Sequence, residues 1–284
     1  MQGERPMNPQ GHSGVWEASF VSLPTLPDLE SPFYLVDLAA RPDALRRLYE
    51  QDPNPRCRLI YNGTPHEGAR EAGPLLVEPV SADAQTLFRE GLQAGWAVAA
   101  AGPSLTLDDA DAHFRQLAEV GAPEGPVLFR FAAPDVLGSM GESFTHTQCR
   151  QLLGPLTALT GTLDGQAWQC HQPAPHKPEK DEPFTLTENN LRHVAQVRRQ
   201  RLADSLARHY ELPQMTVSTW FDQCHALGAP HEQALVEGSR ALARQGLDGP
   251  LTPDQLDRIA GQGRDWSARL AALNEWPQGA RETA

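Results

Sequence analysis

The sequence predicts two lobes of different fold class: an α/β lobe with a mixed sheet and flanking helices, followed by an all-α lobe. Three observations predict this division. Short apolar runs alternate with amphipathic stretches over residues 32–170, which is typical of an α/β layer. Residues 184–284 show helical periodicity alone. Between the two lobes, residues 171–183 contain four prolines and no periodicity, which indicates a linker.

The elements of the first lobe follow in order along the chain. Residues 1–31 are polar and proline-spotted, so we expect a mobile N-terminal arm. Ser81 is placed to cap the second of three helical stretches, and Asp108 and Asp109 fall in the first turn of the third, where the helix dipole favours negative charge. Short apolar runs predict five strands, over 33–36, 57–61, 75–77, 96–101 and 127–131.

The second lobe contains start and stop signals for a series of helices. Thr187 is placed to cap a long first helix, and Pro213 ends it. A later helix opens with Thr252-Pro253-Asp254-Gln255, a capping box with proline at the first helical position. Apolar residues recur at helical spacing throughout, so we expect several short helices packed around one small core.

Length and charge exclude some function classes. A chain of 284 residues is long enough for one or two domains, each with its own core. The net charge of −12 argues against binding to nucleic acid or to an anionic membrane, because both need a cationic face. No apolar run approaches the ~20 residues of a membrane span, and the polar N-terminus lacks a signal-peptide core. We therefore expect a cytoplasmic protein.

Lysine usage narrows the enzyme classes. The chain has only two lysines, Lys177 and Lys180, and both lie in the predicted linker. A Walker phosphate loop needs a lysine at the start of a helix after a glycine-rich turn, and neither lysine has that setting. A Schiff-base enzyme needs a lysine that is desolvated in a pocket. We expect no catalytic residues and no cofactor.

One group of cysteines and histidines has metal-ligand chemistry. His146 and Cys149 lie three residues apart, and Cys170, His171 and His176 follow downstream. Cys and His are the ligands that zinc prefers, so a metal-dependent hydrolase that uses these residues stays open as an alternative function. No Cys-x-x-Cys pair is present, and Cys149 and Cys170 equally fit a core as small apolar residues. Our prediction is that the chain binds no metal.

The helical lobe supplies the candidate partner-binding residues. Arg198, Arg199 and Arg201 concentrate positive charge on one helix of an acidic protein. They form either a solvated face that pairs with local acids or a patch for an acidic partner. Trp220 and Trp266 either anchor a partner helix or belong to the core. We predict that all five contribute to a partner-binding surface.

An ordered set of motifs in the first lobe resembles the type VI secretion effector chaperone/adaptor family, often called Tap or TEC. The resemblance covers 33–170 and begins with the strand Phe33-Tyr34-Leu35-Val36-Asp37. The other matching stretches are 59–64, 73–77, 95–96, 113–117 and 126–137. The resemblance assigns structural family-motif roles to Gly73, Pro74, Arg130, Phe131 and Pro134. The family usually carries Arg-Phe-Tyr-Asp-Pro-Arg at the last strand, whereas Ala132, Ala133 and Asp135 replace its Tyr, Asp and second Arg here.

The resemblance implies a carrier without enzymatic activity. Such a protein binds the N-terminal region of a cognate effector in the bacterial cytoplasm and helps load it onto the VgrG spike protein. Its partners would be the effector and VgrG, with no nucleic acid and no membrane. Two alternatives stay open: an immunity protein that neutralises a toxin, and the Cys/His metal-dependent hydrolase.

Overall fold

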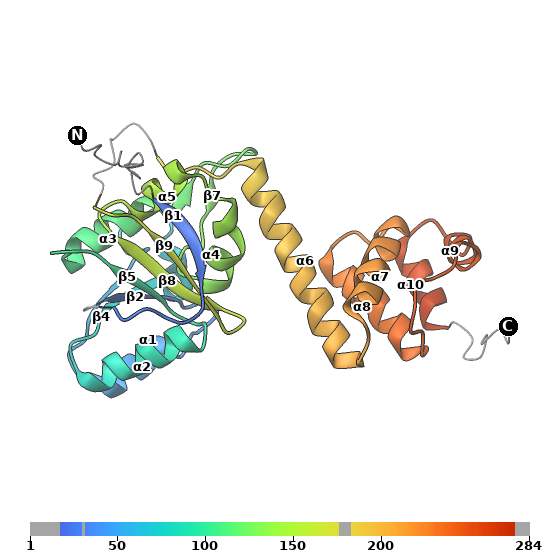
Figure 1. The fold of residues 1–284 in the computed structure, drawn as a ribbon, viewed down its shortest axis with the longest axis horizontal. Coiled ribbons are helices and arrows are strands. Elements are labelled where there is room, and N and C mark those ends of the chain that lie inside the picture. Colours follow the sequence, from blue (N-terminus) through green and yellow to red (C-terminus); the bar gives the residue numbers. More distant parts are fainter. Residues whose placement is uncertain (1–17, 30–31, 176–182, 276–284) are drawn as a thin grey trace, which may run out of the picture. The chain divides into compact units, whose positions relative to one another are not determined.

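The computed structural model describes residues 18–29, 32–175 and 183–275. The chain divides into two compact units, Met1–Val194 and Ala195–Ala284, here called unit 1 and unit 2. Unit 1 contains an antiparallel sheet with flanking helices, and the helices that follow make up unit 2 (Figure 1). The predicted succession of a lobe with a sheet and flanking helices followed by an all-helical lobe is therefore confirmed.

The sheet of unit 1 has seven strands in the spatial order β1-β9-β8-β5-β2-β4-β3. Every pair of neighbouring strands in it is antiparallel, so the expectation of a mixed sheet is wrong. The strands are β1 (Ser19–Leu23), β2 (Phe33–Asp37), β3 (Arg56–Leu59), β4 (Pro74–Glu78), β5 (Val98–Ala101), β8 (Ala158–Leu163) and β9 (Gln166–His171).

The antiparallel pairing follows from how the first two helices cross the sheet. Helix α1 (Ala44–Gln51) joins β2 to β3, and helix α2 (Ala82–Gln93) joins β4 to β5. The two strands that each helix joins are not neighbours in the sheet. Strand β4 lies between β2 and β3, and strand β2 lies between β4 and β5, and each of these intervening strands is antiparallel to both of its neighbours. This is a split β-α-β arrangement, to which β8, β9 and β1 add three further strands. The alternation of strands and helices in the sequence predicts that helices connect the strands. It does not predict that another strand lies between the two strands that each helix connects.

Helices cover both faces of this sheet, because alternate residues of the buried strands point to opposite sides. Tyr34 and Val36 pack with α1 and α2, whereas Leu35 belongs to the core on the other face. That second face is covered by α3 (Leu107–Gln116), α4 (Pro134–Met140) and α5 (His146–Leu153) (Figure 1). Two short 3₁₀ helices, η1 (Glu67–Ala72) and η2 (Gly141–Ser143), are the other helices before α6 within the described residues.

Two expectations for unit 1 need correction. Residues 19–23, expected in a mobile arm, form edge strand β1, which pairs along its length with β9. Residues 127–131, expected as a strand, contribute only β7 (Val127–Leu128), which pairs with β6 (Glu119–Val120) outside the main sheet. The apolar Phe129 and Phe131 are buried by packing against other aromatic rings, so their burial does not need a strand.

The predicted linker lies mostly outside the described residues. Residues 176–182 are not described, and on either side of them Gln172 and Phe184 are buried. Helix α6 (Glu188–Tyr210) begins at the predicted cap, where the Asn190 N–H donates to Thr187 Oγ1 (3.3 Å). The buried Asn190 amide also accepts a hydrogen bond from Gln148 (2.7 Å) on α5. The start of α6 is thereby fixed to unit 1, and the boundary between the units falls inside this helix.

Unit 2 is helical, as predicted. Its elements are the rest of α6, α7 (Gln214–Ala226), α8 (Glu232–Arg244), α9 (Pro253–Ala260) and α10 (Trp266–Asn274). The capping box at Thr252 is confirmed, because its side chain accepts from the Gln255 N–H and the Gln255 side chain accepts from the Thr252 N–H. A separate core surrounds the fully buried Trp220, Phe221 and Leu242.

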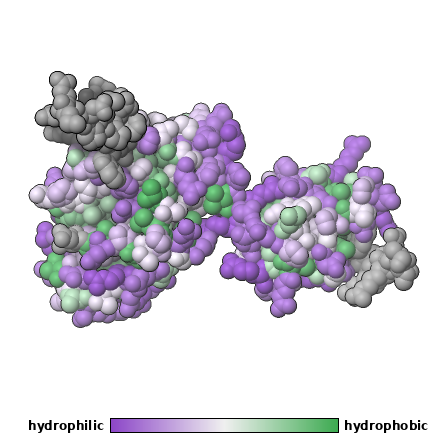
Figure 2. Space-filling model, viewed as in Figure 1, coloured by the Kyte–Doolittle hydropathy of each residue, from purple (hydrophilic) through white to green (hydrophobic). Residues whose placement is uncertain are grey.

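The surface of each unit is mostly hydrophilic or neutral on the face seen in Figure 2, where apolar residues form small patches. Within the described residues, no helix combines the length and apolar character needed to cross a membrane.

Candidate functional site

Three of the family-motif residues, Gly73, Pro74 and Arg130, meet at the end of strand β2. Asp37, the last residue of β2, is buried, and the Arg130 guanidinium donates to its Oδ2 from Nε (2.8 Å) and from a terminal nitrogen. The Ala39 N–H donates to Oδ1 of the same carboxylate (2.9 Å). Burying a carboxylate costs free energy unless it is paired and hydrogen-bonded, and here both oxygens have donors. The pair fixes the segment before α4 against β2.

Tyr61 and Gly73 extend this arrangement. A Cβ atom built on Gly73 would lie 2.5 Å from Cδ2 of the Tyr61 ring, so only glycine lets the ring pack there. Burial raises the pKa of the Tyr61 hydroxyl; the Asp37 carboxylate raises it further, and Arg130 opposes both. Pro74 opens β4, and its carbonyl accepts from the Ile60 N–H (3.0 Å). We call Asp37, Tyr61, Gly73, Pro74 and Arg130 the Asp37 cluster.

Phe131 and Pro134 also have packing roles. The Phe131 side chain is fully buried, with its ring stacked on Phe114 at a centroid distance of 5.3 Å. Pro134 is buried at the first turn of α4, where its missing N–H needs no acceptor. The motif residues thus hold the scaffold of unit 1 together.

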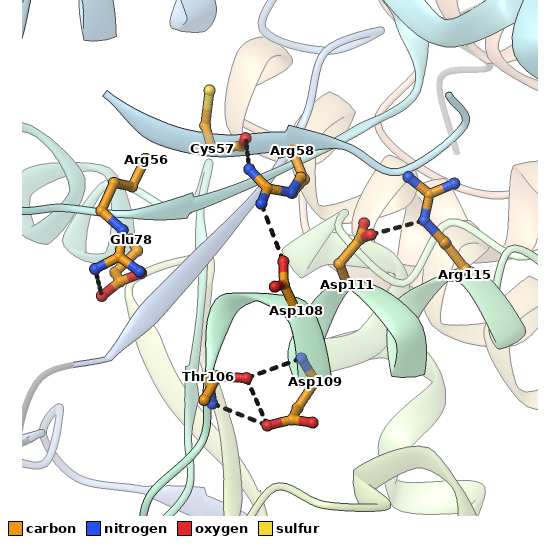
Figure 3. A network of polar contacts seen from close by, with 9 residues as sticks. All are labelled: Arg56, Cys57, Arg58, Glu78, Thr106, Asp108, Asp109, Asp111 and Arg115. Carbon is orange, nitrogen blue, oxygen red and sulfur yellow. Dashed lines mark hydrogen bonds and ion pairs between the residues drawn. The ribbon is translucent and has the colours of Figure 1, made fainter. Parts of the chain in front are cut away.

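A second polar group lies on the exposed edge of the same sheet (Figure 3). Arg56 and Arg58 point to the same side of β3. Arg56 donates to Glu78 Oε1 on β4 (2.8 Å), and Arg58 donates to Asp108 Oδ1 in the first turn of α3 (3.0 Å). The other terminal nitrogen of Arg58 donates to the main-chain carbonyl of Cys57 (3.1 Å). Arg58 therefore links the strand edge to the helix.

Two hollows adjoin this edge and share Arg56. The smaller, of about 220 Å³, is lined by residues that include Arg58, Leu107 and Asp108. The larger, of about 570 Å³, is lined by residues that include Arg89, Glu78 and the exposed Val80. In each hollow two arginines face one carboxylate, although the whole chain carries a net charge of −12. We call β3 with these two hollows the β3 edge site.

The arginines predicted to bind a partner have acidic neighbours within unit 2. Arg198 donates to Glu232 Oε2 on α8 (2.9 Å), and Arg199 donates to Asp222 Oδ1 on α7 (2.6 Å). The Arg199 guanidinium carbon also lies 5.9 Å from the centre of the Phe221 ring. Arg201 is half-buried on the same helix. The contacts of Arg198 and Arg199 join α6 to the helices that follow it, so both arginines already have a structural role within unit 2.

The two tryptophans differ in their surroundings. Trp220 is fully buried, and its indole N–H donates to the Gly249 carbonyl (2.8 Å), so its assignment to a partner surface needs correction. Its spacing on α7 places it on the apolar face with Val217 and Cys224, which packs into the core. Trp266 is half-buried against α8, where Gly238 leaves room for its ring.

Four of the five residues considered as zinc ligands lie in the described part of the chain and have other partners there. Cys149 and Cys170 are buried beside each other; the hydrogen bond between their thiols, together with burial, raises the pKa of Cys170. The raised pKa disfavours the thiolate of Cys170, which is the form that binds metal or attacks. His146 Nδ1 lies 2.7 Å from the Ala18 carbonyl, and His171 Nε2 lies 3.2 Å from Ser19 Oγ. His176 lies outside the described residues, among which no group of three or more His, Cys, Asp and Glu is placed to hold a metal.

Sequence reasoning missed the β3 edge site. The only local signal is the alternation of Arg56 and Arg58 in a short strand, which places both on one face. Asp108 was interpreted only as a helix-terminal acid. Its pairing with Arg58 joins residues 50 positions apart, and no local pattern reports that distance.

The comparisons with known proteins give one match. A family model described as "Domain of unknown function (DUF4123)" matches residues 33–151, which lie within unit 1. The comparison with curated proteins found no match, and neither did the comparison with solved structures.

Proposed function

We propose that this chain is a non-enzymatic adaptor and chaperone. It would bind the N-terminal region of a cognate type VI secretion effector in the cytoplasm of the producing bacterium and help load that effector onto the VgrG spike. The observation that carries the proposal is the ordered set of motifs over 33–170. The match to DUF4123 at residues 33–151 covers most of the same interval and is consistent with a type VI secretion adaptor.

The roles of the motif residues support a binding scaffold. Gly73, Pro74, Arg130, Phe131 and Pro134 all serve packing or ion pairing. Ala132 and Ala133, where the family carries polar residues, are 1% and 2% exposed. Both side chains are packed in the apolar core of unit 1, so this part of the scaffold is held by apolar packing. An open edge with two hollows then offers a surface on which another chain can rest.

The test is a comparison of binding and secretion. The chain is co-expressed with the products of its neighbouring genes, and complexes are purified and sized by light scattering. We expect a stable complex with the N-terminal region of one of these proteins. Deleting the chaperone gene should stop secretion of that effector and leave the mutant cells resistant to it.

The alternatives give different outcomes. An immunity protein would bind the toxic domain instead of the N-terminal region, and its loss would make the cells sensitive. A metal-dependent hydrolase would contain stoichiometric metal after purification, measured by mass spectrometry of the intact full-length protein. Either outcome would overturn the proposed function.

A further inference from the structure

The main chain of β3 has hydrogen-bonding groups that point away from the sheet. In antiparallel strands, alternate residues bond to the neighbouring strand. The Ile60 N–H donates to the Pro74 carbonyl, and the register pairs Arg58 with Leu76 and Arg56 with Glu78, so these three residues face β4. Cys57 and Leu59 therefore direct their N–H and C=O groups to the open side. Within the described residues, β3 has no other strand beside it.

Arg58 closes part of this open side. The Leu59 carbonyl is used in a turn, where it accepts from the Asn62 N–H (3.0 Å). The Cys57 carbonyl accepts from the Arg58 guanidinium, which Asp108 holds from the opposite side. Asp108 is highly exposed, with 84% of its side chain accessible, so its ion pair with Arg58 is weak. A competing carboxylate and a competing main-chain donor can together replace both contacts of Arg58.

We infer that the β3 edge accepts an extended segment of the effector as an added strand, with a carboxylate side chain of that segment pairing with Arg58. Strand addition uses the N–H groups of Cys57 and Leu59 and the Cys57 carbonyl for affinity, and the flanking hollows for side chains. The charge of the surface selects the chemistry of the occupant. Arg56 lines both hollows, so together they contain three arginines against two carboxylates. On a chain with a net charge of −12, this local excess of positive charge favours an acidic segment over a basic one.

This inference rests on the proposed function, and its test begins once the effector is in hand. The probe is a set of overlapping 15-residue peptides that cover the N-terminal region of the effector, titrated against the full chain. Binding is measured by calorimetry, and amide hydrogen exchange is followed with residue resolution. We expect one acidic peptide to bind and to slow the exchange of the Cys57 and Leu59 amides.

Two substitutions at one position separate strand addition from other contacts. Cys57→Pro removes the outward N–H without removing a hydrogen bond to β4, and edge strands tolerate proline in that orientation. Cys57→Val keeps the N–H and serves as the matched control. We expect Cys57→Pro to weaken binding about tenfold or more and Cys57→Val to leave it within about twofold. Thermal unfolding of both variants checks that the fold is kept.

A second pair of substitutions tests the role of charge. Asp108→Asn frees Arg58 from its internal partner, so we expect binding to tighten about two- to fivefold, whereas Arg58→Glu should weaken it about tenfold or more. Asp254→Asn makes the same charge change in the first turn of α9 in unit 2 and should have no effect.

The outcomes distinguish this inference from the proposed function. If the full-length effector does not bind at all, the proposed function fails. If it binds, but neither Cys57→Pro nor Arg58→Glu weakens the complex and the two amides stay unprotected, only the strand-addition inference is overturned. A wild-type dimer that Cys57→Pro converts to a monomer would assign the edge to a second copy of this chain and would also overturn it.

Discussion

Within the Asp37 cluster, Gly73 is the residue at which adding a single methyl group has the clearest expected effect on stability. A Cβ there would lie 2.5 Å from the ring of Tyr61, a buried residue in the loop after β3. We expect Gly73→Ala to lower the free energy of unfolding by about 1–3 kcal/mol, because overpacking forces the ring or the backbone to move. Urea denaturation measures the change.

The control for this prediction is a second glycine five residues earlier. A Cβ on Gly68, in η1, would meet no atom within 4 Å. Gly68→Ala should therefore leave stability within about 0.5 kcal/mol of the wild type. Equal losses in the two variants would show that the close contact with Tyr61 does not limit residue 73.

The four cysteines should differ in reactivity in the folded protein. Cys149, Cys170 and Cys224 are buried, and burial raises the pKa of Cys224 to about 12. Cys57 is half-buried, and burial raises the pKa of its thiol as well. A raised pKa keeps a thiol protonated to higher pH, so labelling of Cys57 should speed up as the pH rises above about 9.

A disulfide reagent that releases a coloured thiolate measures this difference. We expect one thiol to react in the native protein and four after unfolding in denaturant. Cys57→Ser should remove the native reaction. Rapid native labelling of two or more thiols would contradict the described burial.

At the scale of elements, substitutions in the ion pair between α6 and α7 test whether Arg199 stabilises the fold or binds a partner. Arg199→Asp places two carboxylates side by side, so we expect a loss of about 1 kcal/mol or less at this exposed site. Adding Asp222→Arg exchanges the two charges and should restore stability, measured by thermal unfolding.

The affinity of each of these two variants for the effector is then compared with its stability. If Arg199 contacts an acidic partner directly, the exchanged pair recovers stability but not affinity, because the positive charge has moved to α7. If affinity follows stability in both variants, Arg199 only joins two helices. The arginine patch would then not be a partner surface.

At the scale of the whole molecule, the two cores predict two unfolding events. Leu242 lies in the core of unit 2 and Leu152 in the core of unit 1, and each is at most 1% exposed. Leu242→Ala should destabilise unit 2 by about 2–5 kcal/mol, and Leu152→Ala should do the same for unit 1.

Calorimetry distinguishes independent from coupled units. We expect each substitution to lower one transition temperature and leave the other unchanged. A single transition that shifts equally in both variants would mean that the two cores unfold as one cooperative unit, despite their separation along the chain.

Local patterns in the sequence predicted much of this molecule. Apolar runs located β2, β3, β4 and β5, and the caps at Ser81, Thr187 and Thr252 lie where the structure has them. These features depend on neighbours a few residues apart, so the sequence contains the whole signal. The change from an α/β lobe to an all-α lobe is readable for the same reason.

The remaining features were decided only by tertiary structure. Alternating strands and helices do not reveal whether the two strands that a helix joins are neighbours in the sheet. Here another, antiparallel strand lies between them, so the sheet is antiparallel instead of mixed. The apolar face of α7 buries Trp220 because α8 and α9 pack over the same core, which helical spacing alone does not reveal. Arg58 meets Asp108 across 50 residues of sequence, and Arg130 meets Asp37 across 93. Such contacts arise when separate elements pack together, so no local pattern of residues encodes them.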